Sequence, residues 1–183
     1  MGCDIHQKLF VFSKVENKMV PATSITSDGS VRYFPEIVGD RDYNLFGLFG
    51  NSARSYYPEL DCFEGYEWPD FMNGTTFIKR VDNCDYHTRR WCKLENLRKS
   101  LCEYKERLND PFKFKEYYDS EDDLVLDAVE GKISKKDFAN FHSDVLNSIE
   151  ETINRIDEVV SWLDDFSEIV DPQNAVLVTW MDS

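Results

Sequence analysis

The residues best suited to chemistry stand near the start of the chain, in the run Cys3-Asp4-Ile5-His6. On a strand, Asp4 and His6 point to the same face, because successive side chains alternate. Such a pair can ligate a metal ion, or the carboxylate can orient the imidazole for proton transfer near neutral pH. Two structural alternatives stay open: a half-buried histidine bonded to a carboxylate, and a small core thiol at Cys3 in place of a nucleophile.

A second histidine, His87, lies in residues 83–91, shortly before an expected helix. A carboxylate and two arginines surround it, and the exposed N–H groups of a helix N-terminus favour anions. We therefore take His87 as a second acid/base or ligand and Arg89 as an anion-binding group. The alternative is a helix-capping region with solvated arginines. The third histidine, His142, is expected on the surface of a long helix.

Arg41 lies between two acids at the head of an expected short helix over residues 42–49. Its guanidinium is either a salt-bridged anchor or an anion-binding group. Tyr43 and Asn44 follow it and complete the candidate ligand-binding set with Arg41 and Arg89. The candidate catalytic residues, which are also the candidate ligands of a divalent metal such as zinc or manganese, are Asp4, His6 and His87.

The charge of the chain limits its partners. Its 183 residues carry a formal net charge of −14, with a pI of about 4.6. A field of this sign repels polyanions, so nonspecific binding to nucleic acid is not expected. An acidic surface can instead meet a basic protein or mimic DNA, or simply keep the protein soluble. Five cysteines, an odd number, and no signal peptide predict reduced thiols and a cytoplasmic location. No apolar run approaches the roughly 20 residues of a membrane span.

The hydrophobic pattern predicts an α+β fold. Strands are expected near both chain ends, and two helical stripes of apolar residues lie between them. We expect a single domain, 1–183, with a small mixed or antiparallel sheet that includes both termini and packs against a helical hairpin or bundle with one long C-terminal helix. Residues 1–90 and 172–183 would supply the sheet and the site-bearing loops, and 91–171 the helical part. The expected elements are strand 4–12, a ragged hairpin over 13–35, a long irregular segment 55–90, helix 91–108, a weak helix around 124–129, a helix of about 30 residues from Ser134, and strand 175–180.

Several motifs resemble a family of mostly uncharacterised phage and bacterial proteins that open with M-G-C-D-I-H. The matching stretches are Met1 to His6, the R-x-Y-x-L-F segment from Arg41 to Phe46, His87 four residues before Trp91, and the ending 177–182. The family carries an H-S-H-S element whose second histidine is Arg89 here. The resemblance implies a phage-type accessory protein in the host cytoplasm, with one site near Asp4, His6, Arg41 and His87.

These residues lead to a function prediction with two forms. The first is a small hydrolase or phosphoesterase acting on a nucleotide-like anion, with His6 as general base or metal ligand, and counter-defence as the setting implied by a phage origin. The second is a binding protein without chemistry, either a nucleotide sponge or an acidic, DNA-mimic-like inhibitor of a basic host protein. A homo-oligomer held through the 134–166 helix is a third possibility.

Overall fold

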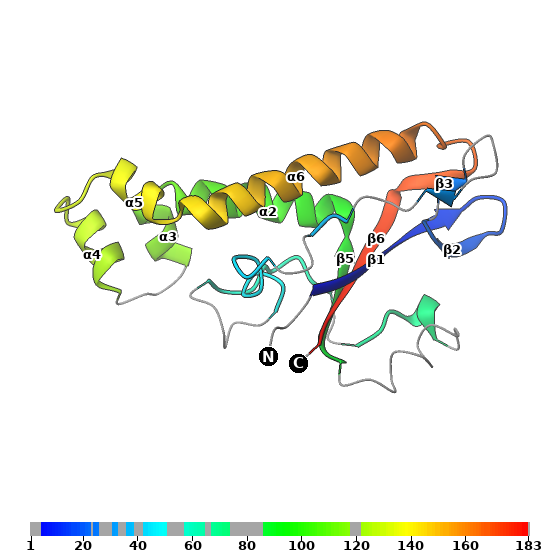
Figure 1. Ribbon diagram of the computed structural model, residues 1–183, viewed down its shortest axis with the longest axis horizontal. Coiled ribbons are helices and arrows are strands. Elements are labelled where there is room, and N and C mark those ends of the chain that lie inside the picture. The colour runs from blue at the N-terminus through cyan, green and yellow to red at the C-terminus, as the bar shows by residue number, and fades with distance from the viewer. Residues whose placement is uncertain are drawn as a thin grey trace.

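The computed structural model describes residues 5–22, 24–25, 31–32, 36–38, 42–50, 57–64, 67–73, 86–117 and 122–182. A sheet lies at one end of the long axis, and two helices run side by side from it toward the other end (Figure 1). The short helices of residues 111–141 gather at that far end. The elements are β1 (Ile5–Ser13), β2 (Lys18–Pro21), β3 (Ser24–Ile25), β4 (Val31–Arg32), η2 (Asp70–Met72), β5 (Tyr86–Lys93), α2 (Leu94–Leu108), α3 (Pro111–Tyr117), α4 (Asp123–Val129), α5 (Lys135–Phe141), α6 (Ser143–Asp164) and β6 (Val170–Asp182).

Both ends of the chain build the sheet, as the sequence predicted. Within the described residues, its strand order is β2-β1-β6-β5, and every neighbouring pair is antiparallel. The last strand, β6, therefore lies between the first strand and β5. The two-stranded ribbon of β3 and β4 is separate from this sheet. The predicted α+β class is confirmed.

The two faces of the sheet carry different side chains because residues alternate along each strand. The inner face packs on α2 and α6 and includes Leu9, Val11 and Leu177 in the main core. The opposite face, called the outer face here, includes Phe10 and its strand partner Val176. The continuous apolar run at the end of β1 is thus buried on both faces, as predicted.

Helices α2 and α6 cover the inner face of the sheet. Apolar residues at helical spacing, such as Ile149, Ile153 and Ile156 of α6, turn toward the core. Because this stripe is already buried within the chain, a second copy would have to meet other residues of the 134–166 region. None of the helices formed by the described residues combines the length and apolar character that crossing a membrane requires.

Two boundaries differ from the sequence prediction. We predicted an irregular segment over 55–90 and a helix from Trp91. The structure instead has strand β5 across this boundary, and α2 begins only at Leu94. The helix predicted to run on from Ser134 is divided into α5 and α6 at His142, whose ψ of 11° departs from helical geometry. The predicted short helix 42–49 is a series of turns.

Candidate functional site

His6 lies on the outer face of the sheet, in a group of aromatic side chains. Its strand partner is Trp180, and the imidazole stacks on that indole with ring centroids 5.7 Å apart and planes 19° from parallel. Trp180 in turn meets Trp68 edge to face at 5.8 Å. Trp68 comes from the segment leading into η2, which lies against the outer face. Three rings from three distant parts of the chain therefore form one aromatic group.

Cationic side chains border these rings. The Arg89 guanidinium lies 5.0 Å from the centre of the Trp68 ring, and the Lys8 ammonium lies 5.8 Å from that of Phe10. Both contacts fall within the range of cation–π attraction. Partial burial lowers the pKa of Lys8 because water is withdrawn from the charged form. These two cations border the aromatic side chains of the outer face, where the exposed carboxylates of Glu67 and Asp70 lie in the same segment as Trp68.

A bulge in β5 gives Arg89 its position. The register moves between His87, which pairs with Met181, and Arg90, which pairs with Thr179. Two residues, Thr88 and Arg89, thus lie opposite Trp180 alone, and Thr88 has a positive φ of 53°. Bulges of this kind redirect a side chain and are frequent beside functional sites. The structure therefore brings His6 and Arg89, both predicted site residues, to one aromatic group.

The backbone of His87 lies at the same end of the sheet. His87 pairs with Met181, while His6 pairs with the preceding residue of the same strand, Trp180. The central strand β6 therefore separates the two histidines by one strand spacing, about 5 Å on each side. The His87 side chain falls outside the described part of the structure, and its role as acid/base or ligand stays a prediction.

The remaining predicted residues have other positions. Asp4 and Arg41 lie outside the described residues, as does Cys3. Tyr43 is 60% exposed, and the Asn44 side-chain amide donates to the Ser148 hydroxyl of α6 at 3.3 Å. Tyr43 and Asn44 are thus associated with the helical layer, away from the outer-face group that holds His6 and Arg89.

Arg90 has a structural environment, although its neighbour Arg89 borders the outer face. It is 5% exposed, forms an ion pair with Glu59 and donates to the Arg89 carbonyl at 2.8 Å. A Cβ at Gly50, where φ is +105°, would lie 2.8 Å from Arg90 Nε. Only glycine suits this place. Arg89 and Arg90 are adjacent but differ in burial, and the sequence did not predict which of the two would be buried.

His142 is a buried histidine, and the sequence-based expectation of a surface position is wrong. It is 1% exposed, and the rings of Phe114, Phe138 and Phe141 lie 4.7–5.5 Å from its own. The Tyr57 hydroxyl and His142 Nδ1 share a hydrogen bond of 2.9 Å. Burial lowers the pKa of His142 to about 4 and, with Asp144, raises that of Tyr57 to about 12. The spacing held a signal: His142 follows Phe138 by four residues and precedes Val145 by three.

No three His, Cys, Asp or Glu side chains converge on a possible metal position among the residues that the structure describes. The predicted ligand set Asp4, His6 and His87 includes two side chains outside that part. Zinc or manganese therefore stays a prediction, and of this set only the His6 imidazole has a described environment.

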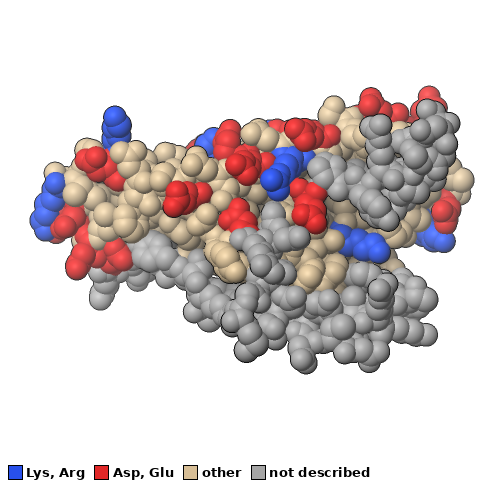
Figure 2. Space-filling view, in the orientation of Figure 1, with Lys and Arg blue, Asp and Glu red and all other residues tan. Residues whose placement is uncertain are grey.

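The acidic helical surface is not a uniform array of carboxylates. Figure 2 shows acidic and basic side chains interspersed along the helices. Arg98 pairs with Asp157, and Lys105 pairs with Glu150, in each case joining α2 to α6. The acidic-inhibitor hypothesis stays a prediction.

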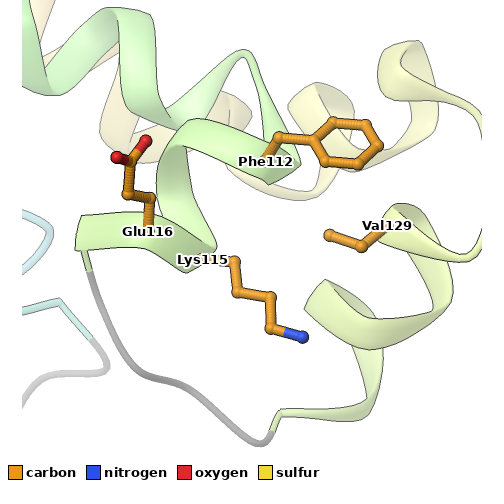
Figure 3. Close-up of a pocket in the computed structure, with 4 residues that line it drawn as sticks. All are labelled: Phe112, Lys115, Glu116 and Val129. Carbon is orange, nitrogen blue, oxygen red and sulfur yellow. The ribbon is translucent and has the colours of Figure 1, made fainter.

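A hollow of about 450 Å³ lies between α3 and α4, far from the sheet. Its lining comes from Phe112, Lys115 and Glu116 of α3 and from Val129 of α4. Figure 3 shows Lys115 pointing across the gap toward α4, while Glu116 points away. The hollow contains one cation and none of the predicted site residues.

Comparisons with protein-family models, with curated proteins and with solved structures find no match to this chain. The candidate site therefore rests on its own geometry.

Proposed function

We propose that this protein binds a nucleotide-like anion on the outer face of its sheet. The observation that carries the proposal is the continuous series of rings and cations from His6 through Trp180 and Trp68 to Arg89, with centroid distances of 5.7, 5.8 and 5.0 Å. A nucleotide combines a flat base with a phosphate, and this series combines stacking surfaces with positive charge.

Each part of such a ligand has a physical counterpart on this face. A base stacking on an aromatic side chain contributes about 1–3 kcal/mol, largely independent of base identity. Trp68 and Trp91 are both partly buried on this face. Arg89 offers a planar donor group suited to phosphate oxygens, and Lys8 offers a point charge.

The hydrolase form of the proposal adds chemistry at His6. The imidazole is partly exposed beside Trp180, and the positive groups that would hold a phosphate lie on the same face. A histidine there would take a proton from the attacking water, as general base. Asp4 and His87, the other predicted catalytic residues, would assist as orienting group and second acid/base. The resemblance to phage proteins makes counter-defence in the host cytoplasm the proposed setting.

The proposal is tested by titrating the protein with cyclic and linear nucleotides while following tryptophan fluorescence and heat. We expect the wild-type protein to bind a nucleotide. Arg89→Ala should weaken this binding about tenfold, because it removes a charge-assisted contact. Arg98→Ala is the matched control, because Arg98 is an exposed arginine paired with Asp157 on the helical layer. Equal affinity of both variants and wild type for every nucleotide would reject the site.

The same samples separate the two forms of the proposal. Each nucleotide is incubated with protein and zinc, manganese or magnesium, and the products are separated by chromatography. Turnover that His6→Ala abolishes supports a phosphoesterase. Complete recovery of a tightly bound nucleotide supports a sponge.

A further inference from the structure

Two cysteines from distant parts of the chain meet beside the sheet. Cys62 lies in the loop 57–64, and Cys92 lies near the end of β5. The loop is attached to that strand by a hydrogen bond of 2.9 Å from the Glu64 amide to the Trp91 carbonyl. Both side chains belong to the main core: Cys92 is 0% exposed and Cys62 packs against the same cluster.

The Cys62 and Cys92 thiols influence each other's ionisation, and their surroundings differ. Cys62 also interacts with the Ser100 hydroxyl, which itself donates to Asp61 Oδ1 at 3.2 Å. The hydrogen bond from Cys92, followed by that from Ser100, lowers the pKa of Cys62 despite its partial burial. The same contact and full burial raise the pKa of Cys92 well above its ordinary value. Cys62 is therefore the partly buried thiol with a lowered pKa, and Cys92 is the fully buried thiol with a raised pKa.

We propose that Cys62 and Cys92 form a thiol oxidation site, at which a hydroperoxide such as hydrogen peroxide converts the pair into a reversible disulfide. This inference is independent of nucleotide binding. It rests on two cysteines that pack into one cluster from two joined segments, with Cys62 only partly buried, and not on any single cysteine.

The reaction balances in two steps. The Cys62 thiolate attacks one peroxide oxygen: the S–O bond forms, the O–O bond breaks, and the departing hydroxide takes the proton that Cys62 had released, giving water. The Cys92 sulfur then attacks the Cys62 sulfur: the S–S bond forms, the S–O bond breaks, and the leaving hydroxide takes the Cys92 proton, giving a second water. The two thiols lose two electrons, and the peroxide gains them.

A disulfide between Cys62 and Cys92 would fix loop 57–64 to strand β5. The loop also carries Tyr57, which is bonded to His142, and Glu59, which is paired with Arg90. A disulfide would fix this connection to β5 and close a loop that contains Trp68 and Arg89. Such a cross-link restricts the unfolded chain and stabilises the fold if the native geometry accepts it.

Peptide mapping tests the proposal on wild-type protein. Fully reduced protein is exposed to hydrogen peroxide, its remaining thiols are alkylated, and it is digested with trypsin. The cleavage sites place Cys62 in peptide 55–79 and Cys92 in peptide 91–93, with Cys84 in 81–89 and Cys102 in 100–105. We expect the 55–79/91–93 linked pair to exceed any other linked pair about tenfold, and a dithiol reductant to remove it.

Variants identify the role of each thiol. Cys62→Ser should abolish the linked pair and leave Cys92 reduced. Cys92→Ser should leave a Cys62 sulfenic acid that dimedone traps. Cys102→Ser is the matched control, since Cys102 is a partly buried thiol of α2, and it should form the linked pair as wild type does. The proposal is overturned if wild type links Cys62 mainly to another cysteine, or if Cys62 oxidises to sulfinic acid without any link to Cys92.

Discussion

The protein places a histidine among aromatic rings in two regions, and the two regions differ in their access to solvent. At the helical end, His142 is 1% exposed and lies among Phe114, Phe138 and Phe141. On the sheet, His6 stacks on Trp180 and stays partly exposed. Aromatic neighbours alone therefore do not define a binding site. A ring enclosed on all sides contributes to the core, whereas a ring with an open side can meet a ligand.

The charged groups around the two histidines differ as well. Arg89 and Lys8 border the rings of the sheet region. Around His142, the charges that act on the pair with Tyr57 are the carboxylates of Asp122 and Asp144. A phosphate would be attracted to the first region and repelled by the second. We therefore infer a stabilising role for the His142 region and keep ligand binding as the proposal for the His6 region, and four predictions test this division.

The largest expected effect comes from opening the aromatic enclosure around His142. Phe114 is 0% exposed and stacks on the imidazole at 5.5 Å. Phe114→Ala should lower the free energy of unfolding by about 3–5 kcal/mol, the usual cost of removing a buried phenyl ring. Urea denaturation measures it. Phe112→Ala, on the same helix at a residue 54% exposed, should change it by less than about 0.5 kcal/mol. Equal losses in both variants would show that the enclosure is not a packed core.

The second prediction concerns pH. The folded His142 has a pKa of about 4, against 6.5 for the free side chain. Between these values the unfolded chain binds a proton that the folded chain does not, so stability is complete above pH 6.5 and falls as the pH decreases toward 4. The full loss is about 3 kcal/mol. Urea denaturation at pH 7.5, 6.5, 5.5 and 4.5 measures this slope. Because carboxylates also begin to titrate at the lowest of these values, the His142→Gln protein is measured at the same four pH values.

His142→Gln removes the titrating group and should flatten that slope. Tyr57→Phe separates the effect of the hydrogen bond from that of burial. It deletes the hydrogen bond to His142 Nδ1 but keeps the ring that shields His142 from water. If desolvation is the cause, the Tyr57→Phe protein keeps the slope. A wild-type free energy of unfolding that stays constant from pH 6.5 to 4.5 would contradict a buried neutral histidine.

The two regions also differ in how well the sequence predicted them. The continuous apolar run at the end of the predicted strand 4–12 correctly indicated a strand, β1, that is buried on both faces, because such a run needs no information from elsewhere. Strand β5 was missed, since Y-H-T-R-R-W-C-K has no regular alternation and its bulge at Thr88 shifts the faces midway. Its strand character comes from pairing with β6, which local sequence does not encode.

The functional assignments show the same limit. The position of His6 on a strand followed from the residues, but its stacking partner is 174 positions away in Trp180. The contribution of Trp68 depends on a segment read only as irregular. His142 lies on the stripe between Phe138 and Val145, and we expected it on the surface because polar residues are adjacent to it. Helical spacing was the better guide.

A third prediction tests the open region directly. Trp68→Ala should weaken the binding of a nucleotide by about 1–3 kcal/mol, the range for one base–aromatic stack. Trp162→Ala is the matched control, since Trp162 is also partly buried but lies on α6, where it makes a tilted contact with Phe166 with ring centroids 4.7 Å apart. Calorimetric titration measures both. Equal weakening would mean that loss of an indole acts through stability and not through a contact with the base.

The smallest expected effect is the cost of His6→Ala to folding. The lost interaction is one stack on Trp180, for which aromatic pairs give about 0.5–1.5 kcal/mol. Urea denaturation of His6→Ala and His142→Ala side by side should therefore show a loss of about 1 kcal/mol for the first and a clearly larger one for the second. If His6→Ala costs more than about 3 kcal/mol, the outer-face rings form a second core that needs His6 to fill it. The His6 region would then resemble the His142 region, and the argument for a ligand on that face would lose its physical basis, since the exposed side of the ring is what distinguishes the two.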